Sequence, residues 1–167
     1  NNAVFLTDPN KLLLDDSIQV FREAKKQGAF IFWNHPAWTP QRKDGIATLT
    51  DVHRMLIKEK LIDGIEVVSD QMYSDEALQI ALDNNLTIMG NSDIHKLIDW
   101  DFKVADGGHR PVTLVFAKER NAESIKEGLM NRRTVAVYKN LFVGRDQFLI
   151  PIIENSLKVT SAKYIGK

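Results

Sequence analysis

The strongest constraint on the fold is a repeating order of short apolar runs and helix-like segments. Three apolar runs have the character of strands buried on both faces, and they span residues 29–34, 64–68 and 86–90. The helix-like segments between and before them cover residues 15–27, 50–60 and 74–84. This alternation predicts an α/β fold with a mainly parallel sheet or barrel.

Residues with metal-binding side chains accompany each of these strands. His35 follows the first run, and Glu66 lies inside the second. Asp93 and His95 follow the third, and in an extended backbone residues two apart point to the same side. Because the carboxyl ends of parallel strands gather on one face, we expect these four side chains to meet there. Carboxylate and imidazole ligands together suit zinc, iron or manganese.

Glu66 has two possible roles. A carboxylate within a buried strand is costly unless a cation or a strong donor compensates it. It either binds a metal directly or orients a ligand or a water molecule. The sequence leaves both roles open.

Composition narrows the class of protein. The chain has 167 residues, of which 44% are hydrophobic and 26% charged, as expected for a globular fold with a substantial core. Its 22 basic and 22 acidic residues balance, which disfavours a nucleic-acid partner. The absence of cysteine excludes disulfides, thiolate metal sites and cysteine nucleophiles. No apolar stretch reaches the roughly 18 residues needed to span a bilayer.

The ordered motifs resemble those of the PHP (polymerase and histidinol phosphatase) superfamily. They are Asn34-His35-Pro36, Gly64-Ile65-Glu66-Val67 and Gly90-Asn91-Ser92-Asp93-Ile94-His95. A longer match, through His109-Arg110-Pro111 and residues 113–120 to Gly144-Arg145, is similar to bacterial phosphodiesterases of the Sb-PDE type. The resemblance implies a distorted seven-stranded, TIM-like β/α barrel. It also implies a site with up to three divalent transition metals (zinc, manganese or iron) that hydrolyses a small phosphoester.

The resemblance also assigns roles to residues. It implies that His35, Asp93 and His95 bind metal, with Glu66 at a further family position. Asp93 can also bridge a metal and the attacking water, which gives it a catalytic role. His109 and Arg110 precede the strand predicted over residues 111–117, and they are candidates to stabilise charge on the phosphoryl group. For Arg110 the alternative is a solvated loop cation.

One family feature is missing. The family opens with a His-x-His pair, whereas the four histidines here are His35, His53, His95 and His109. We therefore expect residues 1–150 to be the C-terminal portion of a barrel whose first strands are missing. Residues 151–167 would begin a truncated β segment, with a strand-like alternation over residues 157–164.

Three functions are compatible with this pattern. The first is a metal-dependent phosphoesterase in the full-length protein, of which this fragment alone would be inactive. The second is a catalytically incompetent metal-binding or purely structural domain, which the missing His-x-His pair favours. A polymerase-associated exonuclease is weaker, because no basic groove is visible.

Four other ring side chains have less specific interpretations. His53 lies one position off the apolar stripe of its helix, which predicts a surface histidine. Trp33, inside a strand, is expected in the core. Trp38 and Trp100 lie in the two long loops, where each either lines a pocket for an ester substituent or covers the core.

Overall fold

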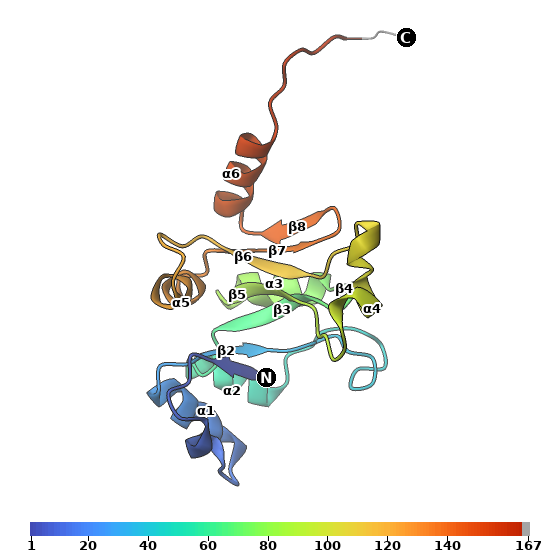
Figure 1. The fold of residues 1–167 in the computed structure, drawn as a ribbon. Helices are drawn as coiled ribbons and strands as arrows, with labels where there is room; N and C mark the ends of the chain where they lie inside the picture. The colour runs from blue at the N-terminus through green and yellow to red at the C-terminus, as the bar shows by residue number, and fades with distance from the viewer. Residues whose placement is uncertain (165–167) are drawn as a thin grey trace.

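The structure is a computed structural model that describes residues 1–164 (Figure 1). Its strands are β1 (Asn2–Val4), β2 (Phe30–Trp33), β3 (Gly64–Ser69), β4 (Met72–Tyr73), β5 (Thr87–Asn91), β6 (Val112–Val115), β7 (Thr134–Tyr138) and β8 (Leu141–Gly144). Its α-helices are α1 (Ser17–Lys26), α2 (Asp51–Lys58), α3 (Asp75–Asp83), α4 (Ile98–Phe102), α5 (Ala122–Met130) and α6 (Asp146–Ser156). Two short 3-10 helices are η1 (Pro9–Leu12) and η2 (Val104–Asp106).

A parallel arrangement of β2, β3 and β5 forms the centre of a five-stranded sheet. Gly64 of β3 lies opposite Phe32 of β2 on one side and Thr87 of β5 on the other. The edge strand β1 and the short β4 pair antiparallel with β2 and β3. The parallel α/β arrangement expected from the sequence is therefore present.

The helices between these strands begin where the sequence predicts. In α3 the Ser74 side chain accepts the Ala77 N–H, and the acidic Asp75 and Glu76 occupy the first turn. That turn favours negative charge because the helix dipole is positive there. Ala77 and Ala81 are fully buried, so α3 packs closely on the sheet.

A second sheet contains β6, β7 and β8 in antiparallel order. Threonine hydroxyls connect it to β5. Thr113 Oγ1 accepts the Gly90 N–H and donates to the Gly90 carbonyl, both at 2.9 Å. Thr134 Oγ1 donates to the Ile88 carbonyl at 2.7 Å. The close approach of β7 to β5 requires glycine at position 90, because a Cβ added there would lie 2.9 Å from the Cβ of Ala136.

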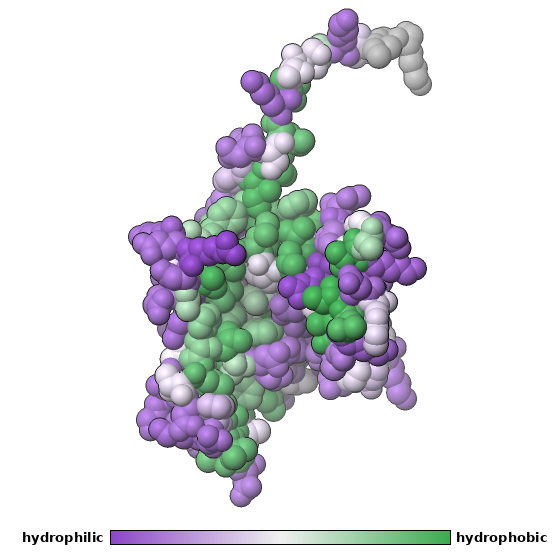
Figure 2. All heavy atoms as spheres, in the orientation of Figure 1, coloured by the Kyte–Doolittle hydropathy of each residue, from purple (hydrophilic) through white to green (hydrophobic). Residues whose placement is uncertain are grey.

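Neither sheet closes into a barrel within residues 1–164. The resemblance implies only part of a seven-stranded barrel for this chain, and closure of such a barrel is not seen in residues 1–164, where β6 meets β5 through the Thr113 side chain and runs antiparallel to β7. Figure 2 shows a band of apolar residues below α6, with hydrophilic residues on both sides. Apolar side chains therefore reach the surface on this face.

The strand predicted over residues 157–164 is not formed. These residues leave the end of α6 as an exposed, extended segment (Figure 1), and they pair with no strand. A strand needs a neighbour for its backbone groups, and alternation alone does not supply one. The boundary expected at residue 150 falls inside α6, and residues 165–167 lie outside the described part. No helix within residues 1–164 has the length and apolarity to cross a membrane.

Candidate functional site

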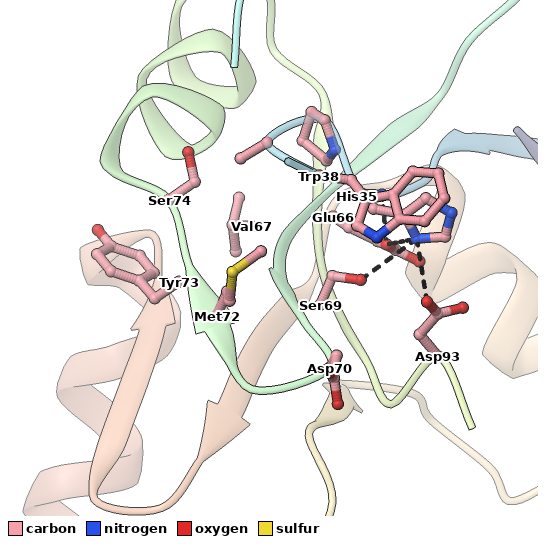
Figure 3. Close-up of a pocket in the computed structure, with 12 residues that line it drawn as sticks. His35, Trp38, Glu66, Val67, Ser69, Asp70, Met72, Tyr73, Ser74 and Asp93 are labelled. Carbon is pink, nitrogen blue, oxygen red and sulfur yellow. Dashed lines mark hydrogen bonds and ion pairs between the residues drawn. The ribbon is translucent and has the colours of Figure 1, made fainter. Parts of the chain in front are cut away.

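The carboxyl ends of β2, β3 and β5 bring three of the predicted site residues together (Figure 3). His35 Nδ1 lies 3.6 Å from Glu66 Oε2 and 3.7 Å from Asp93 Oδ2. Ser69 Oγ is 3.5 Å from the same nitrogen. Trp38 covers the other side of the imidazole, with ring centroids 5.7 Å apart. The expected meeting of side chains at the strand ends therefore occurs for His35, Glu66 and Asp93.

Glu66 is 3% exposed, and protein N–H groups surround its carboxylate. Oε2 accepts the backbone N–H of His35 at 2.7 Å. Oε1 accepts the side-chain amides of Asn34 at 3.1 Å and Asn91 at 2.8 Å. These three donors explain how a charged group is tolerated inside a strand without a cation.

The backbone at this site departs from regular geometry. His35 has φ of 33° and Asp93 has φ of 48°, so both lie in the left-handed region. The register between β3 and β5 also shifts between Glu66 and Val68, as at a β-bulge. Irregularities of both kinds are common next to functional sites, where they redirect side chains.

His95 does not join the other three residues. Strand β5 ends at Asn91, and the left-handed turn at Asp93 breaks the alternation that would align the two side chains. The exposed His95 ring instead places Nδ1 2.7 Å from the backbone carbonyl of Asp93. The expectation that Asp93 and His95 point to the same side because the strand continues is therefore wrong; His95 as a metal ligand stays a prediction.

A divalent metal fits part of this donor set. Two ligands bound about 2.1 Å from one zinc ion at tetrahedral angles lie about 3.4 Å from each other. The 3.7 Å between His35 Nδ1 and Asp93 Oδ2 and the 3.6 Å between His35 Nδ1 and Glu66 Oε2 are both close to this separation. Among residues 1–164, however, no three His, Asp or Glu side chains are grouped to hold a metal ion. His35 and Asp93 are therefore spaced to act as two ligands, and a complete coordination sphere would need further groups.

Arg110 and His109 lie on different hollows of the surface. Arg110 lines a cavity of about 550 Å³ together with Asn34, Glu66 and Asp93. His109 lines a separate hollow, and its ring meets the Tyr138 ring edge-on at 6.0 Å. Of the two predicted phosphoryl-binding residues, Arg110 is therefore the one that shares a cavity with the strand-end carboxylates.

A smaller cavity of about 60 Å³ adjoins His35 on its other side. Trp38, Met72 and Tyr73 contribute the apolar part of its wall (Figure 3). Burial and a hydrogen bond to Asp75 raise the pKa of Tyr73 to about 12, so its hydroxyl stays protonated near neutral pH. Trp100 is 68% exposed and does not line this cavity.

His53 has a structural role. Its ring stacks on Trp33 with centroids 3.7 Å apart, and Trp33 is buried as expected. His53 also closes the start of α2, since its N–H donates to Thr50 Oγ1 while its Nδ1 accepts the Thr50 N–H. It is half-buried, so the surface position predicted from the helical stripe is only partly correct.

Asn34 and Asn91 lie inside the family-like motifs, but their position in the sequence alone predicts no role for either of them. Asn34 directly follows the buried strand β2, and Asn91 is the last residue of β5. A polar side chain at the end of a buried strand was the signal that could have marked them as site residues. Their function becomes visible only once the fold places both amides beside Glu66.

Comparisons with known proteins identify the family. Neither a protein-family model nor a curated protein matches the chain. A solved structure from Bacteroides vulgatus, described as a two-domain protein containing a predicted PHP-like metal-dependent phosphoesterase, superposes with a TM-score of 0.92. It is 45% identical over 98% of this chain, and the chain spans 48% of that protein. The motifs, the strand-end cluster and this match agree, and the chain belongs to the PHP superfamily.

Proposed function

We propose that this chain forms part of the site of a metal-dependent phosphoesterase that hydrolyses a small phosphoester. The observation that supports it best is the 3.7 Å approach of His35 Nδ1 and Asp93 Oδ2 at the strand ends. Asp93 and Arg110 also line one cavity, so a cation site and a phosphate-binding cation would be neighbours. The Bacteroides relative's description supports the same reaction class.

The residues present have distinct tasks in this proposal. His35 and Asp93 would hold a divalent cation. When bound, such a cation would polarise the phosphate and make a water molecule more acidic. The guanidinium of Arg110 presents paired N–H donors that match phosphate oxygens. Trp38, Met72 and Tyr73 would contact the ester substituent in the smaller cavity.

Finer assignments rest on the family resemblance. They are hydrolysis of a phosphodiester, as in the Sb-PDE type; up to three zinc, manganese or iron ions; and participation of His95 and His109. A closed seven-stranded barrel belongs with them. Because the chain spans about half of its Bacteroides relative, we propose that it is part of a longer protein and that the complete ligand set belongs to that longer protein.

The test compares this chain with the longer protein that contains it. Both are stripped with a chelator, reloaded separately with zinc, manganese or iron, and assayed with a nitrophenyl phosphodiester and the matching monoester. We expect metal-dependent hydrolysis by the longer protein, with preference for the diester, and strong loss of turnover in His35→Ala and Asp93→Ala. Asp51→Asn, which alters an exposed carboxylate on α2, is the matched control and should leave turnover unchanged.

A catalytically incompetent domain is the second candidate. It is favoured by the absence, among the described residues, of any three side chains grouped for a metal. Metal content by plasma mass spectrometry decides between the two. Two or three transition-metal ions in the longer protein, with one or none in this chain, would support the phosphoesterase. No metal in either protein would support the incompetent domain.

A further inference from the structure

We propose that Glu66 is a positioning residue that binds no metal itself and holds His35, Asn34 and Asn91 in the geometry the site requires. This inference rests on the proposed function for the role of His35. It resolves the two interpretations of Glu66 that the sequence leaves open.

The oxygen atoms of Glu66 are bound by donors from the protein. Its two oxygens accept three N–H groups, from His35, Asn34 and Asn91, at 2.7 to 3.1 Å. The carboxylate is 3% exposed, so the protein rather than solvent provides its partners. These donors already occupy most of the acceptor positions of the carboxylate, so a metal would compete with them for a buried group.

The backbone of His35 is held by Glu66 in an uncommon conformation. A histidine with φ of 33° is strained, and such strain persists only where the surroundings hold it. The bond from the His35 N–H to Glu66 Oε2 is the shortest of the three and fastens this strained residue directly. Glu66 therefore holds the backbone from which the imidazole reaches toward Asp93.

The amide of Asn34 is also bound to Glu66. Its nitrogen must face Glu66 Oε1, so the orientation of the amide is fixed. Its oxygen is buried, and no donor among the described residues reaches it. An interaction network that served stability alone would not leave a buried acceptor unpaired. The orientation of Asn34 is explained if the network serves the site.

The experiment exchanges the carboxylate and the amide. Glu66→Gln keeps the shape but loses one acceptor oxygen. In the double variant Asn34→Asp/Glu66→Gln, the amide introduced at position 66 can donate to the new carboxylate at position 34 and to a flipped Asn91 amide, while its oxygen accepts the His35 N–H. Net charge is that of the natural chain. Glu59→Gln is the matched control, because Glu59 is exposed and lies on the helix α2 C-cap.

Two readouts are measured on each variant: hydrogen exchange of the His35 amide by NMR, and affinity for Zn²⁺ alone by calorimetry at constant pH. We expect Glu66→Gln to speed the exchange about tenfold or more, and to weaken Zn²⁺ binding by roughly 10- to 100-fold, as for other residues that orient a metal ligand. The double variant should restore both to within about threefold of the natural chain.

The outcomes separate the alternatives. If Glu66 binds the metal, the double variant will regain slow exchange but not Zn²⁺ affinity, and the proposal is overturned. The proposal is also overturned if the His35 amide exchanges as slowly in Glu66→Gln as it does in Glu59→Gln. If the natural chain binds no Zn²⁺, its strand-end residues need the rest of the longer protein to hold a metal, and the exchange data alone decide the positioning role. Should Glu66→Gln not fold, Asn91→Ala removes one of the three donors to Glu66, and the His35 amide must then exchange faster than it does in Glu59→Gln.

Discussion

At the scale of single residues, the left-handed backbone of Asp93 makes a clean test of its role possible. Asparagine tolerates φ near 48° as well as aspartate does, so Asp93→Asn should keep the fold and remove only the negative charge. We expect the free energy of unfolding in urea to change by less than about 0.5 kcal/mol. Zn²⁺ affinity, measured by calorimetry, should fall about tenfold or more. Unchanged affinity would remove Asp93 from the ligand set.

His53 predicts a pH dependence of stability. Burial, and then the charges of Arg42 and the amino terminus, lower the pKa of His53 below its usual value. The unfolded chain therefore binds the proton at higher pH, and the stability contributed by neutral His53 is complete above about pH 6.5 and is lost as the pH falls through the lowered pKa. His53→Ala should cost about 1–2 kcal/mol at pH 7.5 through the lost cap and the lost stacking on Trp33.

The measurement for His53 is urea denaturation of the natural chain and His53→Ala at pH 7.5 and pH 5. The difference in free energy of unfolding between the two chains should narrow at pH 5. A difference that widens at pH 5 would show that protonated His53 is the form favoured by the fold. Zn²⁺ affinity should be the same in both chains, because His53 lies outside the strand-end cluster.

For the site residues, the sequence predicts which strand end each one occupies but not the direction of every side chain. His35, Glu66 and Asp93 could be placed at one edge because parallel strands align their ends. The side-chain direction of His95 could not be predicted, since it depends on one left-handed residue, Asp93, that no periodicity encodes. The roles of Asn34 and Asn91 likewise depend on where Glu66 lies in space.

At the scale of elements, Thr113 tests how the two sheets are joined. Its hydroxyl satisfies both the N–H and the carbonyl of Gly90, at a junction where β5 and β6 form no backbone ladder. Thr113→Val keeps the shape and leaves both groups unpaired, so we expect a loss of about 2–4 kcal/mol in the free energy of unfolding. Thr48→Val, at an exposed position, is the control and should change it by less than about 0.5 kcal/mol. Equal effects of the two substitutions would contradict the role of Thr113.

The sequence predicts best those elements whose signals are local. The apolar run at residues 29–34 and the capped segment at 74–84 carry local signals, and β2 and α3 form there. The pairing of β6 with β7 depends on partners distant in sequence, so the run at residues 111–117 predicted a strand but not its antiparallel neighbour. Closure into a barrel also depends on pairing between strands that are distant in sequence, so it is the feature of the fold that a local sequence pattern predicts least well.

At the scale of the whole molecule, the structure predicts which C-terminal residues contribute to stability. Residues 157–164 are exposed throughout, so a chain ending at Ser156 should unfold at the same temperature as the full chain. Helix α6 is different. Arg145 Nη2, just before it, donates to the Leu86 carbonyl at 3.0 Å, and Phe148 packs on Phe116 at 5.2 Å.

A chain ending at Gly144 loses both of these contacts. The unpaired Leu86 carbonyl and the uncovered Phe116 ring should together cost about 2–5 kcal/mol, which corresponds to a fall of roughly 4–20 °C in the unfolding temperature of a domain of this size. Differential scanning calorimetry of the three chains measures this directly. If the chain ending at Ser156 also unfolded at a lower temperature, the extended segment would be making stabilising contacts in solution. If the chain ending at Gly144 were as stable as the full chain, α6 would contribute nothing to the core, and the stable unit would end at β8.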